Sequence, residues 1–544
     1  MSNPVENVMI ATLGEHPAVI TAGITAMEKI AGIPIHRLHV LHPQDTDKYI
    51  GREGYQLIER HLRGQCQVFS VPLPFSDANS TETSIQFLRR LVDTLNQYQD
   101  DQKYNVYLLI AGGRKSTAAF MALVGQFYSA VHGIYHLLDK NENSRNPAFP
   151  SIEQLELEMT AAEIQAALDP PIERLNLISI PYPGAFASPV KLRTALKSFE
   201  TGKESEGVEL SPDAEFFFRD VFQSSNNNSR LEVWLSQKAF DQYKCYSASR
   251  NSSDNKFLNY FKHMQKPVEL KNGIHGTFNE FHFFKRGHTK ERPFFFTEPN
   301  PIHLYPERSV KRVIVCALAV EQGNGQYTPT AEEIQADIDK HPKFPLSSLN
   351  HRDLTLIIPL GKSPMVATQI YTLLTGSRAE GPSRISTVAL IYPEQNSAIS
   401  NSVRLLKRQF KTKNVEIEDI PLKDLQDLDS HEACKVYLRG LDAAIQKLRE
   451  KHPEREIALS LSGGRKGMSV LAYFAAQHAG IEKVYHMLIT DKDMESRIET
   501  ETTLQALDRL PTDVAKARRL FLEEYDSTKF ELFMVPVIPL KNPI

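Results

Sequence analysis

Apolar and polar positions follow the same order in the first and the last third of the chain, which predicts two copies of one folding unit. Each copy opens with a short apolar run that ends at a glycine, VMIATLG from Val8 and LTLIIPLG from Leu354. A helix-like stretch follows each run, with Pro17 or Pro364 in its first turn, where the missing N–H of proline costs little. This pattern predicts a buried strand, a tight turn and a helix.

The pattern continues in step through both copies. A second and a third apolar run (HRLHVLHP and CQVFSVPLP; STVALIYP and VEIEDIPLK) are followed by a long polar helix and a fourth strand, YLLI or ALSL. Strands that alternate with helices predict a parallel, doubly wound sheet. We therefore expect an α/β protein with two Rossmann-like domains.

The duplication is clearest after the fourth strand. The segments IAGGRKSTAAF and LSGGRKGMSVL place the same GGRK sequence at Gly112 and at Gly463, 351 residues apart. A Tyr-His pair follows at Tyr135 and again at Tyr485. Two copies of one binding design suggest a ligand that is itself two-fold symmetric. For the repeated His136 and His486 we expect packed or hydrogen-bonded side chains rather than catalytic ones.

Both glycine turns of each copy are expected at the carboxyl ends of strands, where doubly wound sheets bind ligands. Glycine lets the backbone approach a ligand, and the helix that follows offers free N–H groups and partial positive charge. The Arg-Lys pair adds full charge, so phosphate is the expected guest. Neither the GxxxxGK[ST] spacing of a Walker A loop nor the GxGxxG dinucleotide fingerprint is present, which disfavours NTP hydrolysis and dinucleotide binding.

Composition narrows the class of protein. The 544 residues are enough for three or four domains, with 41% apolar and 24% charged residues, which is ordinary for soluble proteins. No stretch approaches the roughly 18–20 apolar residues of a membrane span, and the N-terminus lacks a signal peptide's regions. The four cysteines are scattered without CxxC spacing, which disfavours a zinc site and a disulfide framework. They are Cys66, Cys245, Cys316 and Cys434. We expect a cytoplasmic protein with no membrane partner and no metal.

The net charge of −3 hides a basic middle segment. From Arg230 to Arg312 the chain carries 15 Lys and Arg against 8 Asp and Glu, which favours a polyanion partner, RNA or DNA, over an ordinary solvated face. Its pattern predicts a strand and helix (LEVWLSQKAFDQY), a helix from Lys256 to Met264, two strands joined at Gly287 (GTFNEFHFFKRG and ERPFFFTEP) and a last strand, VKRVIVCALAVE. We expect a small α+β domain with an antiparallel sheet.

The TLG-x-x-P opening at Thr12 and the GGRK turns make each repeat resemble a CARF domain, the Rossmann-like sensor of type III CRISPR systems, and especially its ring-nuclease-like branch. CARF domains usually pair in homodimers that hold a cyclic oligoadenylate, most often the tetra-adenylate. The resemblance implies that ligand as activator, with no other cofactor, in a monomer with an internal pseudo-dimer or in a homodimer. It divides the chain into CARF domain 1 (1–190), a linker (191–227), the basic α+β domain (228–345) and CARF domain 2 (346–544).

Carried over residue by residue, the resemblance implies a binding site at the glycine turns of both repeats. Its residues are Leu13, Gly14, Glu15, His16, Gly112, Gly113, Arg114, Lys115 and Ser116 in the first repeat, and Leu360, Gly361, Lys362, Ser363, Gly463, Gly464, Arg465 and Lys466 in the second. In the ring-nuclease branch a hydroxyl residue after the first strand and the GGRK lysine assist attack by a ribose 2′-OH on its own phosphate. Ser363 supplies that hydroxyl in the second repeat only, and Ser116 corresponds to Gly467.

The middle domain resembles the RelE/HigB family of RNA-cleaving toxins in LEVWLSQKAFDQY, LKNGIHGTFNEFHFF and ERPFFF. In that family basic side chains on the concave sheet face orient the 2′-OH and stabilise the phosphorane. The implied catalytic residues are Arg292, Lys285, Arg286, Lys271 and His275, with His282 and His288 as weaker candidates. His303 and Tyr305 are the candidates to replace the family's C-terminal catalytic Tyr or His, which has no clear counterpart.

Together the two resemblances imply a metal-independent endoribonuclease of the mRNA-interferase type that a cyclic oligoadenylate activates, with RNA or ribosome-bound mRNA as substrate. Two alternatives stay open. One is a ring nuclease that degrades cyclic tetra-adenylate in the CARF site, with a structural insert. The other is a non-catalytic, ligand-controlled protein that grips RNA or a ribosome.

Overall fold

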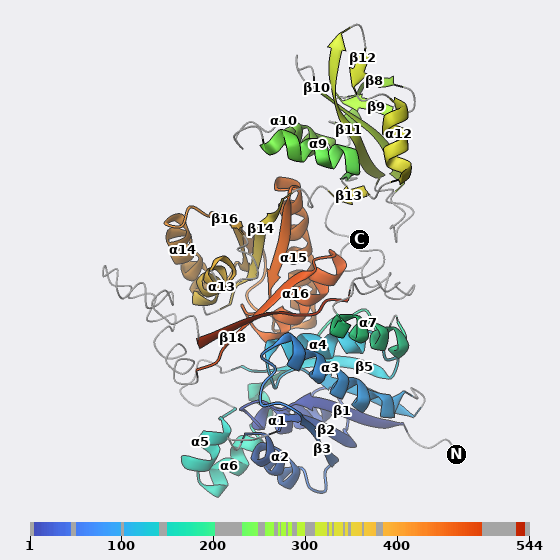
Figure 1. Ribbon diagram of the computed structural model, residues 1–544. Helices are drawn as coiled ribbons and strands as arrows, with labels where there is room; N and C mark the ends of the chain where they lie inside the picture. Colours follow the sequence, from blue (N-terminus) through green and yellow to red (C-terminus); the bar gives the residue numbers. More distant parts are fainter. Residues whose placement is uncertain are drawn as a thin grey trace.

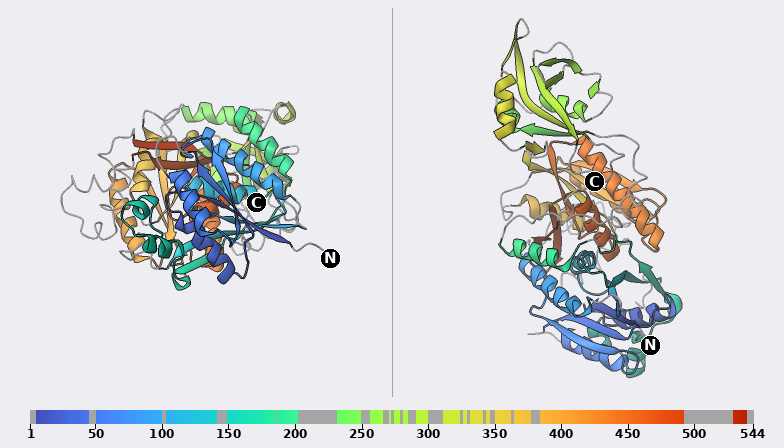
Figure 2. Two further views of the ribbon diagram at one scale, coloured as in Figure 1. Left: turned by 90° about the horizontal axis from the view of Figure 1, so that it is seen from below. Right: turned by 90° about the vertical axis from the view of Figure 1, so that its right-hand side faces the viewer.

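The computed structural model places three β-sheets in a row, with the first repeat at one end, the second in the middle and the basic insert at the other end (Figure 1). The right-hand view of Figure 2 shows the same order along the long axis. The structure describes residues 5–44, 50–99, 103–140, 149–185, 187–201, 231–248, 256–265, 270–271, 274–278, 281–284, 291–299, 311–323, 326–328, 331–340, 343–345, 350–361, 364–376, 384–491 and 529–538.

The first repeat is a six-stranded sheet in the order β3-β2-β1-β4-β5-β6, in which β6 is antiparallel to β5 and the other neighbours are parallel. Its strands and main helices are β1 (Glu6–Thr12), α1 (Ala18–Lys29), β2 (Arg37–Pro43), α2 (Ile50–His61), β3 (Gln67–Leu73), α3 (Thr81–Leu95), β4 (Tyr104–Leu109), α4 (Lys115–Gly125), β5 (Val131–Asp139), α5 (Ile152–Leu157), α6 (Ala161–Leu168), β6 (Leu175–Ser179) and α7 (Pro189–Thr201). Residues of β1 alternate between two cores: Val8 packs with α3 and α4, and Met9 packs with α1 and α2. Burial on both faces explains the unbroken apolar run.

The second repeat has the same topology, in the order β16-β15-β14-β17-β18-β19, again with an antiparallel last strand. Its elements are β14 (Asn350–Pro359), α13 (Met365–Thr375), β15 (Arg384–Pro393), α14 (Ser397–Lys411), β16 (Glu416–Leu422), α15 (His431–Lys451), β17 (Arg455–Ser460), α16 (Lys466–His478), β18 (Lys483–Ile489) and β19 (Phe530–Met534). The expectation of two doubly wound α/β domains is confirmed.

The repeats are joined by α4 and α16, the helices that follow the GGRK turns. The stretches from Ser116 to Gly125 and from Gly467 to His478 are buried throughout. A helix that is apolar on every side must be covered on every side, so each packs on its own sheet and on the other helix. One hydrophobic core therefore spans both repeats. Within it, Gln126 Nε2 donates to Gln477 Oε1 over 3.1 Å.

The insert forms a mixed sheet in the order β13-β7-β11-β10-β9-β8, with β12 beside β11. Its elements are β7 (Leu231–Ser236), α9 (Gln237–Ala248), α10 (Lys256–Met264), β8 (Ile274–Phe278), β9 (Phe281–Phe284), β10 (Glu291–Pro299), β11 (Lys311–Gly323), β12 (Gln326–Thr328), α12 (Ala331–Lys340) and β13 (Lys343–Pro345). The helix at Lys256–Met264 lies where expected.

Two expectations for the insert were wrong. The single strand GTFNEFHFFKRG is two antiparallel strands, β8 and β9, with the polar pair Asn279-Glu280 between them in the sequence. The sheet is not wholly antiparallel, because β7 runs parallel to β11.

None of the helices in the described ranges combines the length and the apolarity needed to cross a bilayer.

Candidate ligand site between the repeats

In the first repeat, the turn after β1 lies directly against the turn after β4. A Cβ atom at Gly14 would lie 3.0 Å from the backbone nitrogen of Gly113, and one at Gly112 would lie 1.7 Å from the carbonyl oxygen of Thr12. Gly113 has a φ of +68°, in the left-handed region that favours glycine. Three glycines thus bring the two turns into backbone contact at the carboxyl end of the sheet.

The second repeat reproduces this contact. A Cβ at Gly361 would lie 2.5 Å from Gly464 Cα, and one at Gly463 would lie 1.7 Å from the carbonyl oxygen of Pro359. Gly464 has a φ of +69°. The predicted turn residues of each repeat are therefore brought together, as expected for a ligand held at the ends of β1 and β4 or of β14 and β17.

An aspartate holds the arginine of each GGRK turn. Arg114 Nη2 donates to Asp77 Oδ2 over 2.8 Å, and its Nε donates to the same oxygen over 3.1 Å. Arg465 Nη2 donates to Asp427 Oδ2, also over 2.8 Å. Each guanidinium is thereby fixed beside the N-terminus of α4 or α16, where the helix dipole adds positive potential.

The sequence-based predictions did not include these aspartates, although both lie in the same short sequence pattern. Asp77 and Asp427 each stand three residues before a serine, and the two positions are 350 residues apart. The serines, Ser80 and Ser430, are the N-caps of α3 and α15. The shared D-x-x-S sequence therefore places an acidic side chain beside the turn of the same repeat.

The lysine of each GGRK turn reaches into the other repeat. Lys115 Nζ donates to the carbonyl oxygen of Ser462 over 2.6 Å, and Lys466 Nζ donates to that of Ala111. Loss of water lowers the pKa of Lys115 to about 8. Loss of water, together with the charges of Lys115 and Arg114, lowers the pKa of Lys466 to about 7. Each ammonium group thus bonds a carbonyl at the GGRK turn of the opposite repeat, and the charge of Lys115 destabilises that of Lys466.

The repeated histidines lie beside these turns. His136 follows Tyr135, whose carbonyl oxygen accepts from the Ile110 amide just before the first turn. Burial and the charges of Lys466 and Arg465 lower the pKa of His136 to about 3. His486 is buried as well, and its Nδ1 lies 3.0 Å from Ser462 Oγ. Both imidazoles are therefore neutral.

The comparisons with known proteins bear on these two repeats. A family model described as CRISPR-associated protein NE0113 (Cas_NE0113) matches residues 16–204 and 363–544, more than half of the chain. The chain belongs to this CRISPR-associated family. The matched ranges contain both GGRK turns and leave out the basic insert. No curated protein matches the chain.

Two solved structures are weakly similar to this CRISPR-associated protein. One is Enterococcus italicus Csm6 bound to cyclic hexa-2′-fluoro-hexa-dAMP, at 10% identity and a TM-score of 0.25, over 50% of this chain and 57% of that chain. The other is described as trehalose-6-phosphate from E. coli bound with UDP-2-fluoro glucose, at 10% identity and a TM-score of 0.18, over 95% and 94% of the two chains. The present chain thus spans little more than half of the Csm6 chain. At these TM-scores we base no argument on either structure.

The turn after β1 contributes further predicted residues. Leu13 is buried, and the carbonyl oxygen of Glu15 accepts from the Ile152 amide over 2.8 Å. Desolvation and the charge of Lys466 lower the pKa of His16, while hydrogen bonds to the Pro150 and Phe149 carbonyls oppose the shift. His16 of the first repeat therefore lies within the field of the second repeat's lysine. In the second repeat Leu360 is buried, and the predicted Lys362 and Ser363 lie outside the described residues.

The predicted catalytic residues of the insert are only partly described. Arg292 lies in β10 opposite Ala319 of β11, and it is 3% exposed. Lys271 is exposed, and the backbone of His275 lies in β8. Lys285, Arg286, His288, His303 and Tyr305 lie outside the described residues. The resemblance to RelE/HigB toxins and the roles of these residues stay predictions.

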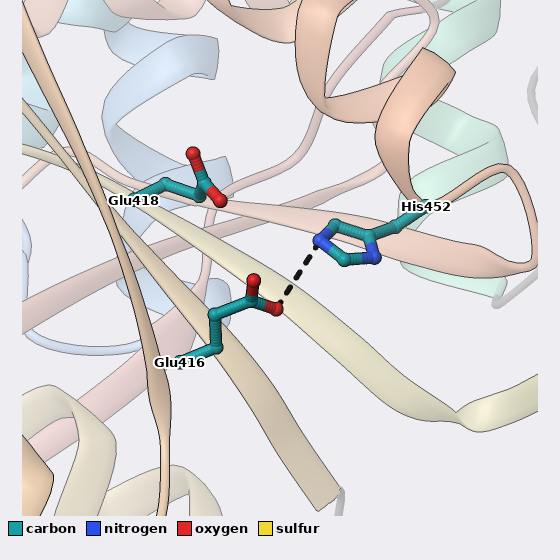
Figure 3. Close-up of side chains that lie close together, drawn as sticks. All are labelled: Glu416, Glu418 and His452. Atoms are coloured by element: carbon teal, nitrogen blue, oxygen red, sulfur yellow. Dashed lines mark ion pairs between the residues drawn. The ribbon is translucent and has the colours of Figure 1, made fainter. Parts of the chain in front are cut away.

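A second group of polar side chains lies on the opposite flank of the second repeat. Glu416, Glu418 and His452 come close together, with His452 Nε2 3.4 Å from Glu416 Oε2 (Figure 3). Lys451 Nζ pairs with Glu418 and, over 2.8 Å, with Glu416. Arg455 Nη1 lies 3.7 Å from the Glu416 carboxylate. Cationic side chains already balance these carboxylates, so the group is explained as an ion-pair network between β16 and the end of α15.

Proposed function

We propose that this CRISPR-associated protein is a receptor for a cyclic oligoadenylate that bridges its two repeats, with cyclic tetra-adenylate as the best candidate. The observation that carries the proposal is the pair of lysines, Lys115 and Lys466, each of which crosses into the opposite repeat. Together with Arg114 and Arg465 they form a cationic set that repeats about a pseudo-two-fold axis. A ring of nucleotides with an even number of phosphates has matching symmetry.

The energetics favour a phosphate ligand at this place. Two ammonium groups whose pKa values are lowered by desolvation gain the most from an anion placed between them. The glycine contacts hold the two turns of each repeat against each other at the sheet end, and the N-termini of α4 and α16 supply oriented N–H groups there. A metal ion is not needed to neutralise the ring.

We propose that ligand binding switches on a ribonuclease in the basic insert, with RNA or ribosome-bound mRNA as substrate. The excess of Lys and Arg between residues 230 and 312 supports a polyanion substrate. The lysines tie the repeats together through backbone carbonyls. A ring that takes over these lysines changes the contact between α4 and α16. It shifts the equilibrium only if it binds the active arrangement more tightly than the inactive one.

Cleavage of the ring at the same site is the second candidate function. Lys466 supports it, because a lysine with a pKa of about 7 is matched to proton transfer near neutral pH. The expected product is a linear oligoadenylate that ends in a 2′,3′-cyclic phosphate, formed when a ribose 2′-oxygen attacks its own phosphate and the 5′-oxygen leaves with a proton.

The test incubates the full chain with labelled cyclic tetra-adenylate, with and without mRNA-loaded ribosomes, and follows both RNAs on one gel. Cleavage of mRNA only in the presence of the ring is the expected result. Loss of the ring with intact mRNA would favour the ring nuclease instead. Binding without cleavage of either RNA would leave a ligand-controlled binding protein, and no binding of any ring size would overturn the receptor function.

A further inference from the structure

The buried polar groups beside the two GGRK turns are not equivalent. Ser462, just before the second turn, offers its hydroxyl to His486, whereas Ala111 stands at the same place before the first turn and offers none to His136. Ser116, the second residue of α4, is 0% exposed, whereas α16 has Gly467 at that position. The two half-sites therefore share their cations but differ in their neutral donors.

Each histidine faces the turn of the opposite repeat. A Cβ atom built at Gly467 would lie 3.6 Å from His136 Cδ2, which places His136 against the first turn of α16. His486 Nδ1 lies 3.0 Å from the hydroxyl of Ser462, whose carbonyl oxygen accepts from Lys115 Nζ over 2.6 Å, so a single residue links His486 to the first residue of α4. Ser116 is the counterpart of Gly467 in the first turn of α4, and it is 0% exposed.

Several of these buried polar atoms have no hydrogen-bond partner within the described parts of the chain. They are Ser116 Oγ, His486 Nε2 and both ring nitrogens of His136. The histidines are 3% and 6% exposed, for His486 and His136 respectively. Burying a donor without a partner costs free energy, so such atoms at the N-terminus of an eleven-residue helix point to a ligand.

The contacts of Ser462 bear on where the proton of His486 lies. Ser462 Oγ accepts from the Met487 amide over 2.6 Å, and it lies 3.0 Å from His486 Nδ1 but 3.4 Å from the Met487 carbonyl oxygen. When the hydroxyl donates to Nδ1, the imidazole proton lies on Nε2, and this is the tautomer that an anion next to Nε2 selects. In that tautomer His486 has a buried N–H donor with no partner in the described parts of the chain.

We propose that His486 and Ser116 together donate hydrogen bonds to the ring phosphate bound at the first GGRK turn, which makes the first half-site the stronger of the two. The second half-site has the same cations, but it lacks the hydroxyl at Gly467 and its histidine has no serine to orient it. The proposal rests on the receptor function above. It assigns binding roles to a histidine of one repeat and a serine of the other, so neither repeat forms the strong half-site alone.

Binding of cyclic tetra-adenylate to variants of the full chain tests the proposal. We expect His486→Leu to weaken binding about tenfold or more, the size of one hydrogen bond to a charged group, and His486→Gln to recover part of the loss through its amide N–H. Ser116→Gly should weaken binding by less. Gly467→Ser should strengthen it, because its added Cβ meets other atoms at 3.5 Å or more and its φ is ordinary.

His39→Leu is the matched control for a buried histidine. His39 Nε2 lies 2.5 Å from Tyr98 Oη and far along the chain from either turn, so this change should lower the melting temperature and leave the dissociation constant unchanged. If His486→Leu does not fold, the pair Ser116→Gly and Gly467→Ser decides alone. Wild-type affinity in all folded variants would show that these groups bind only water and would overturn the proposal. Failure of the wild-type chain to bind any ring would instead overturn the receptor function and this proposal with it.

Discussion

The two GGRK turns make a comparison within one molecule, in which the same backbone is built from partly different side chains. Gly112 matches Gly463 in its close backbone contact, Gly113 matches Gly464 in φ, and the arginine of each turn is held by its own aspartate. In the proposed receptor these are the features that would hold a phosphate. The neutral residues around the turns, such as Thr12 opposite Pro359, have diverged.

This division teaches that the duplicated unit preserves its cation geometry more strictly than its hydrogen-bonding chemistry. In the proposed receptor a symmetric ring needs charge from both halves, because each half would hold one side of it. Attack on one phosphate, or tight binding of one phosphate, needs special donors in one half only. The divergence is therefore compatible with a symmetric ligand whose two halves are bound or cleaved differently.

The largest expected effect comes from removing the feature that the repeats share most closely. The double change Lys115→Ala and Lys466→Ala should weaken binding of cyclic tetra-adenylate by about a hundredfold or more, since each lysine is a charged partner in an enclosed site. Titration of the labelled ring by fluorescence polarisation measures the loss.

The matched control for the double variant is Lys407→Ala. This lysine pairs with Asp419 on the outer side of the second repeat, so its loss should leave ring affinity unchanged. Wild-type affinity in the double variant would show that the two lysines do not bind the ring. It would contradict the inference that the shared cations are what the two repeats need in common.

The glycine contacts predict an equal and large loss of stability in both repeats. Gly112→Ala and Gly463→Ala each force a Cβ atom to 1.7 Å from a carbonyl oxygen, so we expect each to lower the free energy of unfolding by about 3 kcal/mol or more. Gly467→Ala should be neutral or slightly stabilising, because it adds alanine to a helix at ordinary contact distance. Urea unfolding measures all three, and unequal losses at Gly112 and Gly463 would contradict the equivalence of the turns.

The sequence was sufficient to predict the shared half of this comparison but not the divergent half. Apolar runs that end at glycine predict the strands and turns, and the spacing of the copies aligns Lys115 with Lys466. The crossing of each lysine into the other repeat depends on how α4 packs on α16, which no local pattern contains. Asp77 and Asp427 stand 37 and 38 residues before the arginines that they hold, so only the repeated D-x-x-S sequence could have revealed them.

The insert shows the opposite limit of prediction. Its helix at Lys256–Met264 follows from a clear amphipathic pattern, whereas the alternating run around Phe281 predicts one strand where the structure has a hairpin. Period-two alternation continues through a short polar break, so it does not mark where a strand ends.

We expect pH to have an intermediate effect on ring affinity. It should distinguish the repeats, because their lysines lose charge at different pH. Lys466 has a pKa of about 7 and Lys115 a pKa of about 8, both below the ordinary value of 10.5. As the pH rises from 6 to 9, the free protein loses these charges, first at Lys466, and the affinity for the ring should fall about tenfold or more.

Stability without ligand should change in the opposite direction. The folded lysines release their protons at lower pH than the unfolded ones, so the unfolded chain binds more protons between about pH 7 and 10.5 and the free energy of unfolding rises with pH in that window. Dissociation constants and urea unfolding at pH 6, 7, 8 and 9 measure both trends. In Lys115→Met, the pH dependence that comes from Lys466 should move to higher pH, because Lys115 no longer repels the Lys466 charge. An unmoved pH dependence would show that desolvation alone sets the pKa of Lys466.

The smallest effect concerns the aspartates, where the repeats differ in their surroundings. Asp427→Asn should lower the free energy of unfolding by about 1 kcal/mol or less, since its ion pair with Arg465 is partly exposed. Asp77→Asn should cost less still. Desolvation and, after it, the charge of Asp77 raise the pKa of Glu531 in the other repeat, so removing the Asp77 charge also relieves a repulsion. Urea unfolding of the two single variants and of Glu531→Gln with Asp77→Asn measures the difference. If Asp77 repels Glu531, Asp77→Asn should lower the free energy of unfolding as much as Asp427→Asn does when Glu531→Gln is also present. Equal losses for the two single variants would exclude this repulsion.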